Sequence, residues 1–373
     1  MLGRMQRLAS WWLFPCLCLP LTAQRTLADL QQQFIGESQR LAAGEPSAEQ
    51  RQQLLGKQVE ELRKFLDGPA QGDDRWNGRL MLADLNLARG DRKAAIEALR
   101  GIDKGAAPAL LLVTAATMAQ HLALRDLREQ WIAAALAKEA PLADRLAMAR
   151  MLMTVLLEVD KGESLFAAAL TAAGDDEQRA FVRWHRADAL RDREDLPENA
   201  GFDELDRLAK DLPNTYWGSV AKDRLRATQL RVGDDAIGFT TKTNDGASFR
   251  LADQAGKVVV LAFWSLADQD TPGLVATLQQ LRKVHGDRVR VLGISIDRDP
   301  AAIAKAIVDL GIDFPVVGDG LGVMTDVALR WFVEGPSVHV LDSKGKVAAL
   351  GLHTGTADGR TELLDVVTNG VKP

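Results

Sequence analysis

The segment that decides the fold runs GKVVVLAFWSLADQDTP, from Gly256 to Pro272. Residues 258–263 are a continuous apolar run rich in β-branched side chains, which is typical of a strand buried on both faces of a sheet. Polar residues follow from Ser265. Thr271 followed by proline is a typical helix start, because threonine is a favoured N-cap and proline a favoured first helical residue. The segment therefore predicts a buried strand that passes through a short loop into a helix.

Downstream of this segment, strand-like runs alternate with amphipathic helical patterns. The further runs cover residues 289–296, 314–317 and 337–341, and the helical patterns cover residues 272–284, 300–310, 321–331 and 358–367. Glycine-containing turns at residues 244–246 and 342–345 are typical of hairpins, because glycine adopts the positive φ that such turns need. This alternation predicts an α/β domain over residues 232–373, with a central sheet covered on both faces.

Residues 24–231 carry a different pattern. Leucine and alanine recur at three- and four-residue spacing, and short polar breaks such as Gly90-Asp91 separate the helical segments. The pattern predicts an all-α domain of antiparallel helix pairs. Residues 79–99 resemble a tetratricopeptide unit, but the period is irregular, so a helical-repeat array and an irregular bundle both remain open. Helical arrays expose a groove that binds segments of other proteins.

The first residues indicate an export signal. Arg4 and Arg7 precede an apolar run at residues 8–21, which is short for a membrane span and is interrupted by two prolines. We interpret residues 1–23 as a signal peptide that is cleaved after Ala23, with a buried N-terminal helix as the alternative. The prediction is an exported protein of the periplasm or cell envelope that has no membrane span after cleavage.

Cysteine usage and charge restrict the chemistry. The two cysteines, Cys16 and Cys18, both lie in the predicted signal, so residues 24–373 contain neither a disulfide nor a thiol nucleophile. The formal net charge of −5 offers no basic excess for nucleic acid. The five histidines show no metal-ligand spacing, and no glycine-rich phosphate loop is present. We therefore predict no cofactor, no metal site and no nucleic-acid partner.

Residues 232–373 resemble the TlpA-like and AhpC/TSA-like redoxins in the order and spacing of several motifs. Residues 245–251 are similar to the hairpin "dG..v.L" and residues 256–264 to "GKvVlvnFW". Residues 292–297 are similar to "vlgvsiD", residues 314–317 to "fpvv.D", and residues 335–346 to "g.Pt.fliD..Gkv". The resemblance implies a thioredoxin-like fold. Taken alone, it also implies a thiol-disulfide oxidoreductase or peroxidase.

The same resemblance places Asp268 and Thr271 at the two cysteine positions of the family's Trp-Cys-x-x-Cys motif, counted without a gap from Trp264. In the family, the helix N-terminus lowers the pKa of the first thiol and the second thiol resolves the mixed disulfide. An aspartate cannot attack a disulfide, and a threonine is not a nucleophile without an adjacent base. We therefore predict no catalytic residue and interpret Asp268 and Asp270 as carboxylates favoured near the positive helix end.

The remaining function candidates concern binding. The candidate contact residues are Trp264, Asp268, Asp270, Gly335, Pro336 and Ser337. The resemblance implies that Pro336 is the cis-proline beside the loop, where the preceding residue presents its backbone to an extended peptide; turn geometry is the competing interpretation. Gly335 precedes this proline directly, so the loop is one residue shorter than the family's V-x-G-x-P-T.

We thus predict an exported, redox-inactive thioredoxin-like protein that binds another exported protein or a peptide segment. A hydrolase or metal enzyme that uses Asp268 and Asp270 is a further alternative, although two carboxylates alone bind a divalent cation weakly.

Overall fold

The computed structural model describes residues 25–42, 44–68, 70–197 and 199–371. The predicted signal peptide, residues 1–23, lies outside them. The chain divides into two compact units, residues 1–156 and 157–373, which we describe separately. Within the described ranges, no helix is both long and apolar enough to cross a membrane.

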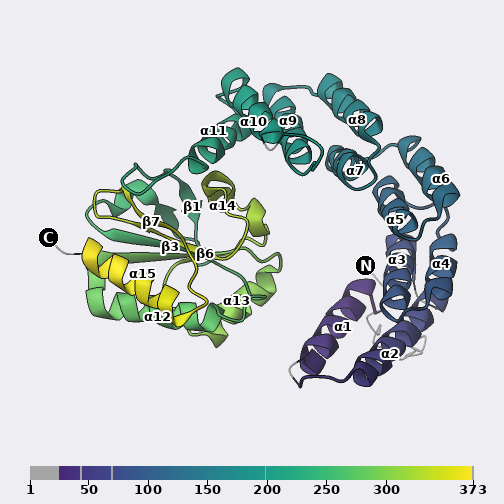
Figure 1. Cartoon of the computed structure of the whole chain (residues 1–373), viewed down its shortest axis with the longest axis horizontal. Coiled ribbons are helices and arrows are strands. Elements are labelled where there is room, and N and C mark those ends of the chain that lie inside the picture. Colours follow the sequence, from purple (N-terminus) through teal and green to yellow (C-terminus); the bar gives the residue numbers. More distant parts are fainter. Residues whose placement is uncertain (1–24, 43, 69, 198, 372–373) are drawn as a thin grey trace, which may run out of the picture. The chain divides into compact units, whose positions relative to one another are not determined.

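The first unit consists of helices (Figure 1). They are α1 (Leu27–Ala42), α2 (Ala48–Asp67), α3 (Gly72–Ala88), α4 (Arg92–Arg100), α5 (Ala109–His121), α6 (Arg125–Leu136) and α7 (Leu142–Thr154). The segment at residues 79–99 forms the end of α3, a turn and most of α4. Gly90 adopts a φ of 80° in this turn, and Asp91 caps α4 by accepting a hydrogen bond from Ala94 N. A helix pair is therefore present here, and its assignment to the tetratricopeptide class stays a prediction.

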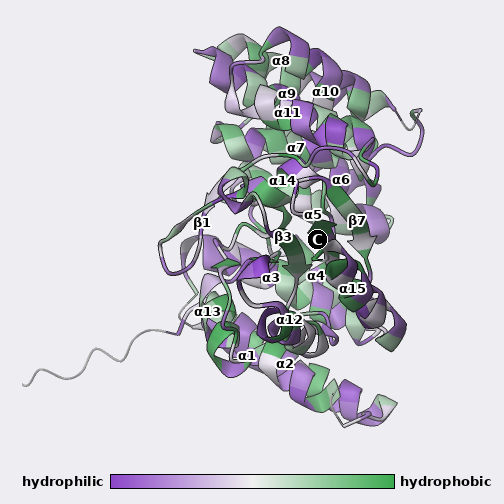
Figure 2. Cartoon of the chain, turned by 90° about the vertical axis from the view of Figure 1, so that its left-hand side faces the viewer, coloured by the Kyte–Doolittle hydropathy of each residue, from purple (hydrophilic) through white to green (hydrophobic). Residues whose placement is uncertain are grey.

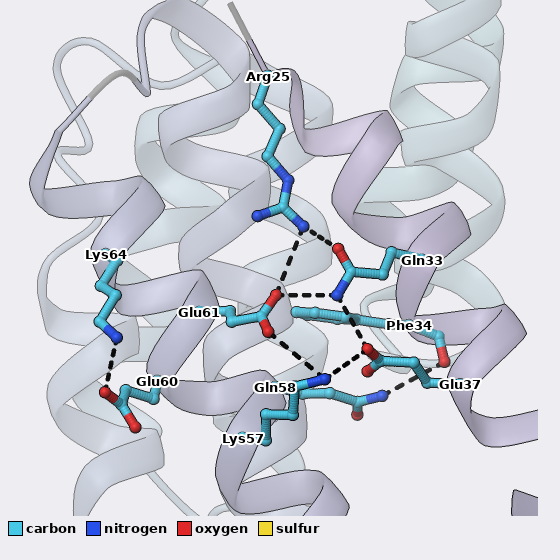
Figure 3. A network of polar contacts seen from close by, with 9 residues as sticks. All are labelled: Arg25, Gln33, Phe34, Glu37, Lys57, Gln58, Glu60, Glu61 and Lys64. Carbon is cyan, nitrogen blue, oxygen red and sulfur yellow. Dashed lines mark hydrogen bonds and ion pairs between the residues drawn. The ribbon is translucent and has the colours of Figure 1, made fainter.

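Polar side chains join α1 to α2 (Figure 3). Lys57 Nζ lies 2.8 Å from Glu37 Oε1, and Gln33 donates hydrogen bonds to both Glu37 and Glu61, at 2.9 Å and 3.0 Å. The bond from Lys57 holds the pKa of the Glu37 carboxyl below its usual value. Gln58, which is buried, donates to the Phe34 carbonyl at 3.3 Å. Because these bonds are directional, they fix how the two helices align as well as holding them together.

The second unit begins with four helices and continues into a sheet domain. The helices are α8 (Val159–Ala172), α9 (Asp176–Arg191), α10 (Ala200–Asp211) and α11 (Tyr216–Ala227). The strands are β1 (Thr240–Lys242), β2 (Ser248–Arg250), β3 (Val258–Trp264), β4 (Val289–Ser295), β5 (Val316–Val317), β6 (Ser337–Leu341) and β7 (Val347–Leu352). Between and after them lie α12 (Thr271–His285), α13 (Pro300–Asp309), α14 (Asp326–Trp331) and α15 (Ala357–Gly370), with short 3-10 turns at Leu251–Gln254, Gly286–Arg288 and Gly322–Met324.

The main sheet has five strands in the order β5-β4-β3-β6-β7. Strand β3 pairs parallel with β4 and antiparallel with β6, and all seven of its residues are buried, as the apolar run predicts. Figure 2 shows the hydrophobic character of this strand. One face of the sheet carries α12, α13 and α15, with Leu278 and Leu363 in the core. The other face packs against β1–β2 and α14, with Phe263 and Trp331 in the core. The predicted α/β domain with both faces covered is therefore confirmed.

Three local expectations differ from the structure. Strand β5 contains only Val316 and Val317, because the preceding Pro315 has no N–H to donate to a ladder. Helix α14 begins at Asp326 rather than near residue 321, where a short 3-10 turn lies instead. No strand run is predicted for β7, although the hairpin turn predicted at residues 342–345 implies a strand after it. The two-domain organisation, all-α and then α/β, agrees with the prediction, whereas the boundary at residues 231 and 232 stays a prediction.

Candidate functional site

The loop between β3 and α12 forms two successive turns. Asp268 N–H donates a hydrogen bond to Ser265 O at 3.1 Å, and Thr271 N–H donates to Asp268 O at 3.2 Å. Asp268 and Thr271, at the positions that the resemblance assigns to thiols, therefore lie at the two ends of one turn.

The Thr271 side chain is buried and hydrogen-bonded within the loop. It is 3% exposed, and its hydroxyl donates to Ser265 O at 2.7 Å. The predicted N-cap role of Thr271 is wrong: the residue before α12 is Asp270, whose side chain makes no capping bond, and Thr271 is the first helical residue. The hydroxyl bonds to the loop carbonyl instead of a helix amide, so it is held as a structural group and not as a nucleophile.

The two aspartates face different surroundings. The half-buried Asp268 accepts a hydrogen bond from Asp270 N at 3.0 Å. Asp270 is exposed, and its carboxylate lies against Gly355, where an added Cβ would lie 2.5 Å from Asp270 Oδ2. Both carboxylates lie near the N-terminus of α12, where the helix dipole favours negative charge. The described part of the chain contains no group of three side chains placed to hold a metal ion.

Asp297 organises the loop, a role that is not predicted from the sequence. Its carboxylate accepts from Ser265 Oγ at 2.8 Å, from Leu266 N at 3.0 Å and from Ser295 Oγ at 2.8 Å. The Ser265 hydroxyl also accepts from Ala267 N at 3.2 Å. A signal for this role exists in the sequence, because a polar residue just after a strand parallel to β3 lies at the same sheet edge as the loop.

The register of β6 brings the second predicted feature to this edge. Phe263 pairs with Ser337, so Pro336 lies next to the end of β3, where the loop starts. Pro336 is exposed, and no atom lies within 4 Å of an added Cβ at Gly335. Ser337 donates to Gly335 O at 3.4 Å. Trp264 is 1% exposed and lies in the core, so it supports the loop from inside rather than facing solvent.

A groove of about 330 Å³ separates the loop from α13. Its lining is formed by Leu266, Asp268, Gln269, Thr271, Pro272, Ala306, Asp309 and Leu310. Leu266 is 40% exposed and places an apolar side chain at the edge of this groove. The site thus combines an exposed apolar side chain, two carboxylates and an open proline loop on a rigid frame.

Fold and loop together define a thioredoxin-like domain. The sequence relationship agrees: residues 232–350 match the AhpC/TSA family. The thioredoxin-like protein YneN of Bacillus subtilis is 23% identical over 155 residues, which are 41% of this chain and 89% of YneN.

The solved structures that are similar to this chain include two thiol-disulfide proteins. The thioredoxin domain of a thiol-disulfide oxidoreductase from Bacteroides vulgatus is 24% identical, with a TM-score of 0.32 over 36% of this chain and 96% of that one. A secreted thiol-disulfide isomerase from Corynebacterium glutamicum is 23% identical, with a TM-score of 0.31 over 36% of this chain and 84% of that one.

Proposed function

We propose that this chain is a redox-inactive thioredoxin-like protein that binds another exported protein or a peptide segment. The observation that carries the proposal is the pair of side chains at the thiol positions, Asp268 and Thr271. A thiolate is the group that attacks a disulfide, and the two cysteines of the sequence, Cys16 and Cys18, lie far from this loop in the chain. The domain therefore retains the redoxin frame without its nucleophile.

The rigidity of the loop supports a binding role. Asp297 holds both the side chain and the backbone of the segment that carries the exposed Leu266. A surface that is ordered before binding loses less conformational entropy when a partner docks, so more of the contact energy appears as affinity. Pro336, next to the start of the loop, adds an open backbone segment for an extended chain.

We also infer that the protein is exported and that its helical region serves as a scaffold. The basis for export is the order of arginines, apolar run and small residue at Ala23. Sequencing the N-terminus of protein recovered from the cell envelope should show Gln24 first. An N-terminus at Met1 in that fraction would contradict cleavage.

The binding role is tested by affinity capture with the full chain as bait and a cell-envelope extract as the source. Leu266→Asp places a charge in the exposed apolar contact and should abolish retention of the captured proteins. Val284→Asp is the matched control, because Val284 is 63% exposed on α12 and lies outside the groove. The proposal fails if the captured set is the same for both variants, or if nothing is retained above an empty support.

A further inference from the structure

Phe332 ends α14 in a backbone conformation that side-chain-bearing residues rarely adopt. Its φ and ψ are 52° and 48°, in the left-handed region, and glycine is the usual residue at such a helix end. The N–H of Phe332 donates to Leu329 O at 3.3 Å, and Val333 N–H donates to Ala328 O at 2.9 Å. Contacts from outside the helix help a phenylalanine to keep this strained conformation.

Helices α9, α10 and α11 supply those contacts. Arg224 of α11 is 4% exposed, and its guanidinium carbon lies 4.6 Å from the centre of the Phe332 ring and 4.9 Å from that of Trp184 on α9. The guanidinium of Arg191 lies 5.3 Å from the same phenylalanine ring, and Phe202 of α10 meets it edge-on at 5.8 Å. Planar guanidinium groups and aromatic rings attract one another when they stack in this way.

Ion pairs hold the segment that follows Phe332. Arg191 Nη1 lies 2.9 Å from Glu334 Oε1, and Arg224 Nη2 lies 3.9 Å from the same oxygen. Asp188 balances the buried charge of Arg224, because its Oδ1 lies 3.2 Å from Arg224 Nη1. One turn earlier, Arg330 of α14 pairs with Asp223 of α11 at 2.6 Å. The loop of residues 332–336, which ends at Pro336, is thus fastened to the preceding helices by both stacking and charge.

We propose that α9–α11 is a built-in clamp that positions this loop, with Arg224 and Arg191 as positioning residues that act through Phe332 and Glu334. Contacts from outside the loop then fix the shape of the sequence before Pro336. The binding face beside Pro336 is then built jointly by the sheet domain and by helices that precede it in the chain. Only the use of this face rests on the proposed function; the clamp itself does not.

Hydrogen exchange of the full chain tests the clamp without any partner. Arg224→Lys keeps the charge but loses the flat stacking group, so exchange at the Phe332 and Val333 amides should rise about tenfold. Amides of β3 should not change and serve as the internal reference. Lys222→Ala is the control, since Lys222 is an exposed residue of the same helix. If Arg224→Lys does not fold, Arg191→Lys should give a rise of about threefold at the same amides.

A second set of variants, made in a chain that carries Phe332→Gly, distinguishes positioning of the loop from general stabilisation of the protein. Glycine adopts the left-handed conformation without help. In a Phe332→Gly background, Arg224→Lys should therefore leave exchange at residues 332 and 333 nearly unchanged. Equal acceleration in both backgrounds, a parallel rise in the β3 amides, or no rise at all in folded Arg224→Lys would overturn the proposal. These outcomes are independent of whether any partner binds.

Discussion

The carboxylate of Asp297 accepts a hydrogen bond from the hydroxyl of Ser265 at 2.8 Å, and this contact ties the end of β4 to the loop that leaves β3. The same carboxylate accepts from Leu266 N, so it holds backbone and side chain together. None of these bonds involves residue 268 or 271. The anchor that Asp297 provides is therefore independent of the side chains at positions 268 and 271, whereas the Thr271 hydroxyl adds a bond of its own to Ser265 O.

Replacing Asp297 by Asn should destabilise the protein by about 2 kcal/mol, because hydrogen bonds to a charged acceptor are worth about 1.5–3 kcal/mol each and the amide retains only part of them. The measurement is the free energy of unfolding in urea. Asp287→Asn is the control, since Asp287 is exposed, and it should change stability by less than about 0.5 kcal/mol. Equal effects of the two substitutions would refute the anchoring role.

Removing the Thr271 hydroxyl should cost less stability than removing the Asp297 charge. Thr271→Val keeps the shape but removes the donor to Ser265 O, and we expect a loss of about 1 kcal/mol in unfolding free energy. Thr271→Ser retains the donor and should lose less. Thr361→Val removes an exposed hydroxyl that donates to a helix carbonyl, so it should stay near the wild-type stability. A Val variant at position 271 as stable as the wild type would contradict the buried bond.

Restoring the thiols tests whether the turn geometry is retained. Thr271 N–H bonds to Asp268 O across one turn. The Cα atoms at the ends of such a turn lie less than about 7 Å apart, which is close to the roughly 4.4–6.8 Å that a disulfide requires. The variant Asp268→Cys/Thr271→Cys, made with Cys16→Ser and Cys18→Ser, should therefore form an intramolecular disulfide under mild oxidation. Intact mass and thiol titration measure it, with the single-cysteine variants as controls. Two free thiols that persist after oxidation would indicate a remodelled loop.

Because His339 is buried, we expect the stability of the protein to depend on pH. Burial lowers its pKa from 6.5 to about 4, and its Nδ1 accepts a hydrogen bond from Gly351 N at 3.1 Å. The folded pKa lies below the unfolded one, so the stabilisation is fully present above pH 6.5 and is lost as the pH falls toward 4. The full effect is about 3 kcal/mol.

Urea unfolding at pH 4.5 and pH 7.5 checks this dependence. Carboxylates also titrate in this range, so the informative quantity is the difference between the wild type and His339→Gln, which cannot ionise. The variant should lose most of the stabilisation gained between the two pH values, whereas His285→Gln should retain it. The same pH slope in His339→Gln and the wild type would argue against a buried neutral histidine.

The sequence predicts the parts of the fold that depend on local pattern. The apolar run at residues 258–263 specifies β3, and Thr271-Pro272 marks the start of α12 to within one residue. The hairpin turn at residues 342–345 implies strand β7, but no strand run is predicted there, because the burial of its side chains alternates irregularly and Gly351, at a φ of 63°, interrupts the pattern. A periodicity argument needs a regular alternation, which this segment does not have.

The rest of the site depends on contacts between distant residues. The stack of Arg224 on Phe332 joins positions more than a hundred residues apart, and no spacing rule relates them. From the sequence, His339 alternates with Val338 and Val340 on a strand, which leaves open whether it faces outward or is satisfied by a neighbour. The outward orientation is wrong, because helices and strands cover both faces of the sheet and leave the side chain 8% exposed, whereas the neighbour contact to Gly351 is present.

The most direct test of the redox-inactive assignment is the rate of insulin reduction with dithiothreitol as electron donor. It is measured for the wild-type chain and for the Cys16→Ser/Cys18→Ser variant, with the same samples also tested for peroxide consumption. We predict that both chains give the rate of the protein-free blank in both assays. Turnover above the blank by either chain, and above all turnover that alkylation abolishes, would contradict the assignment.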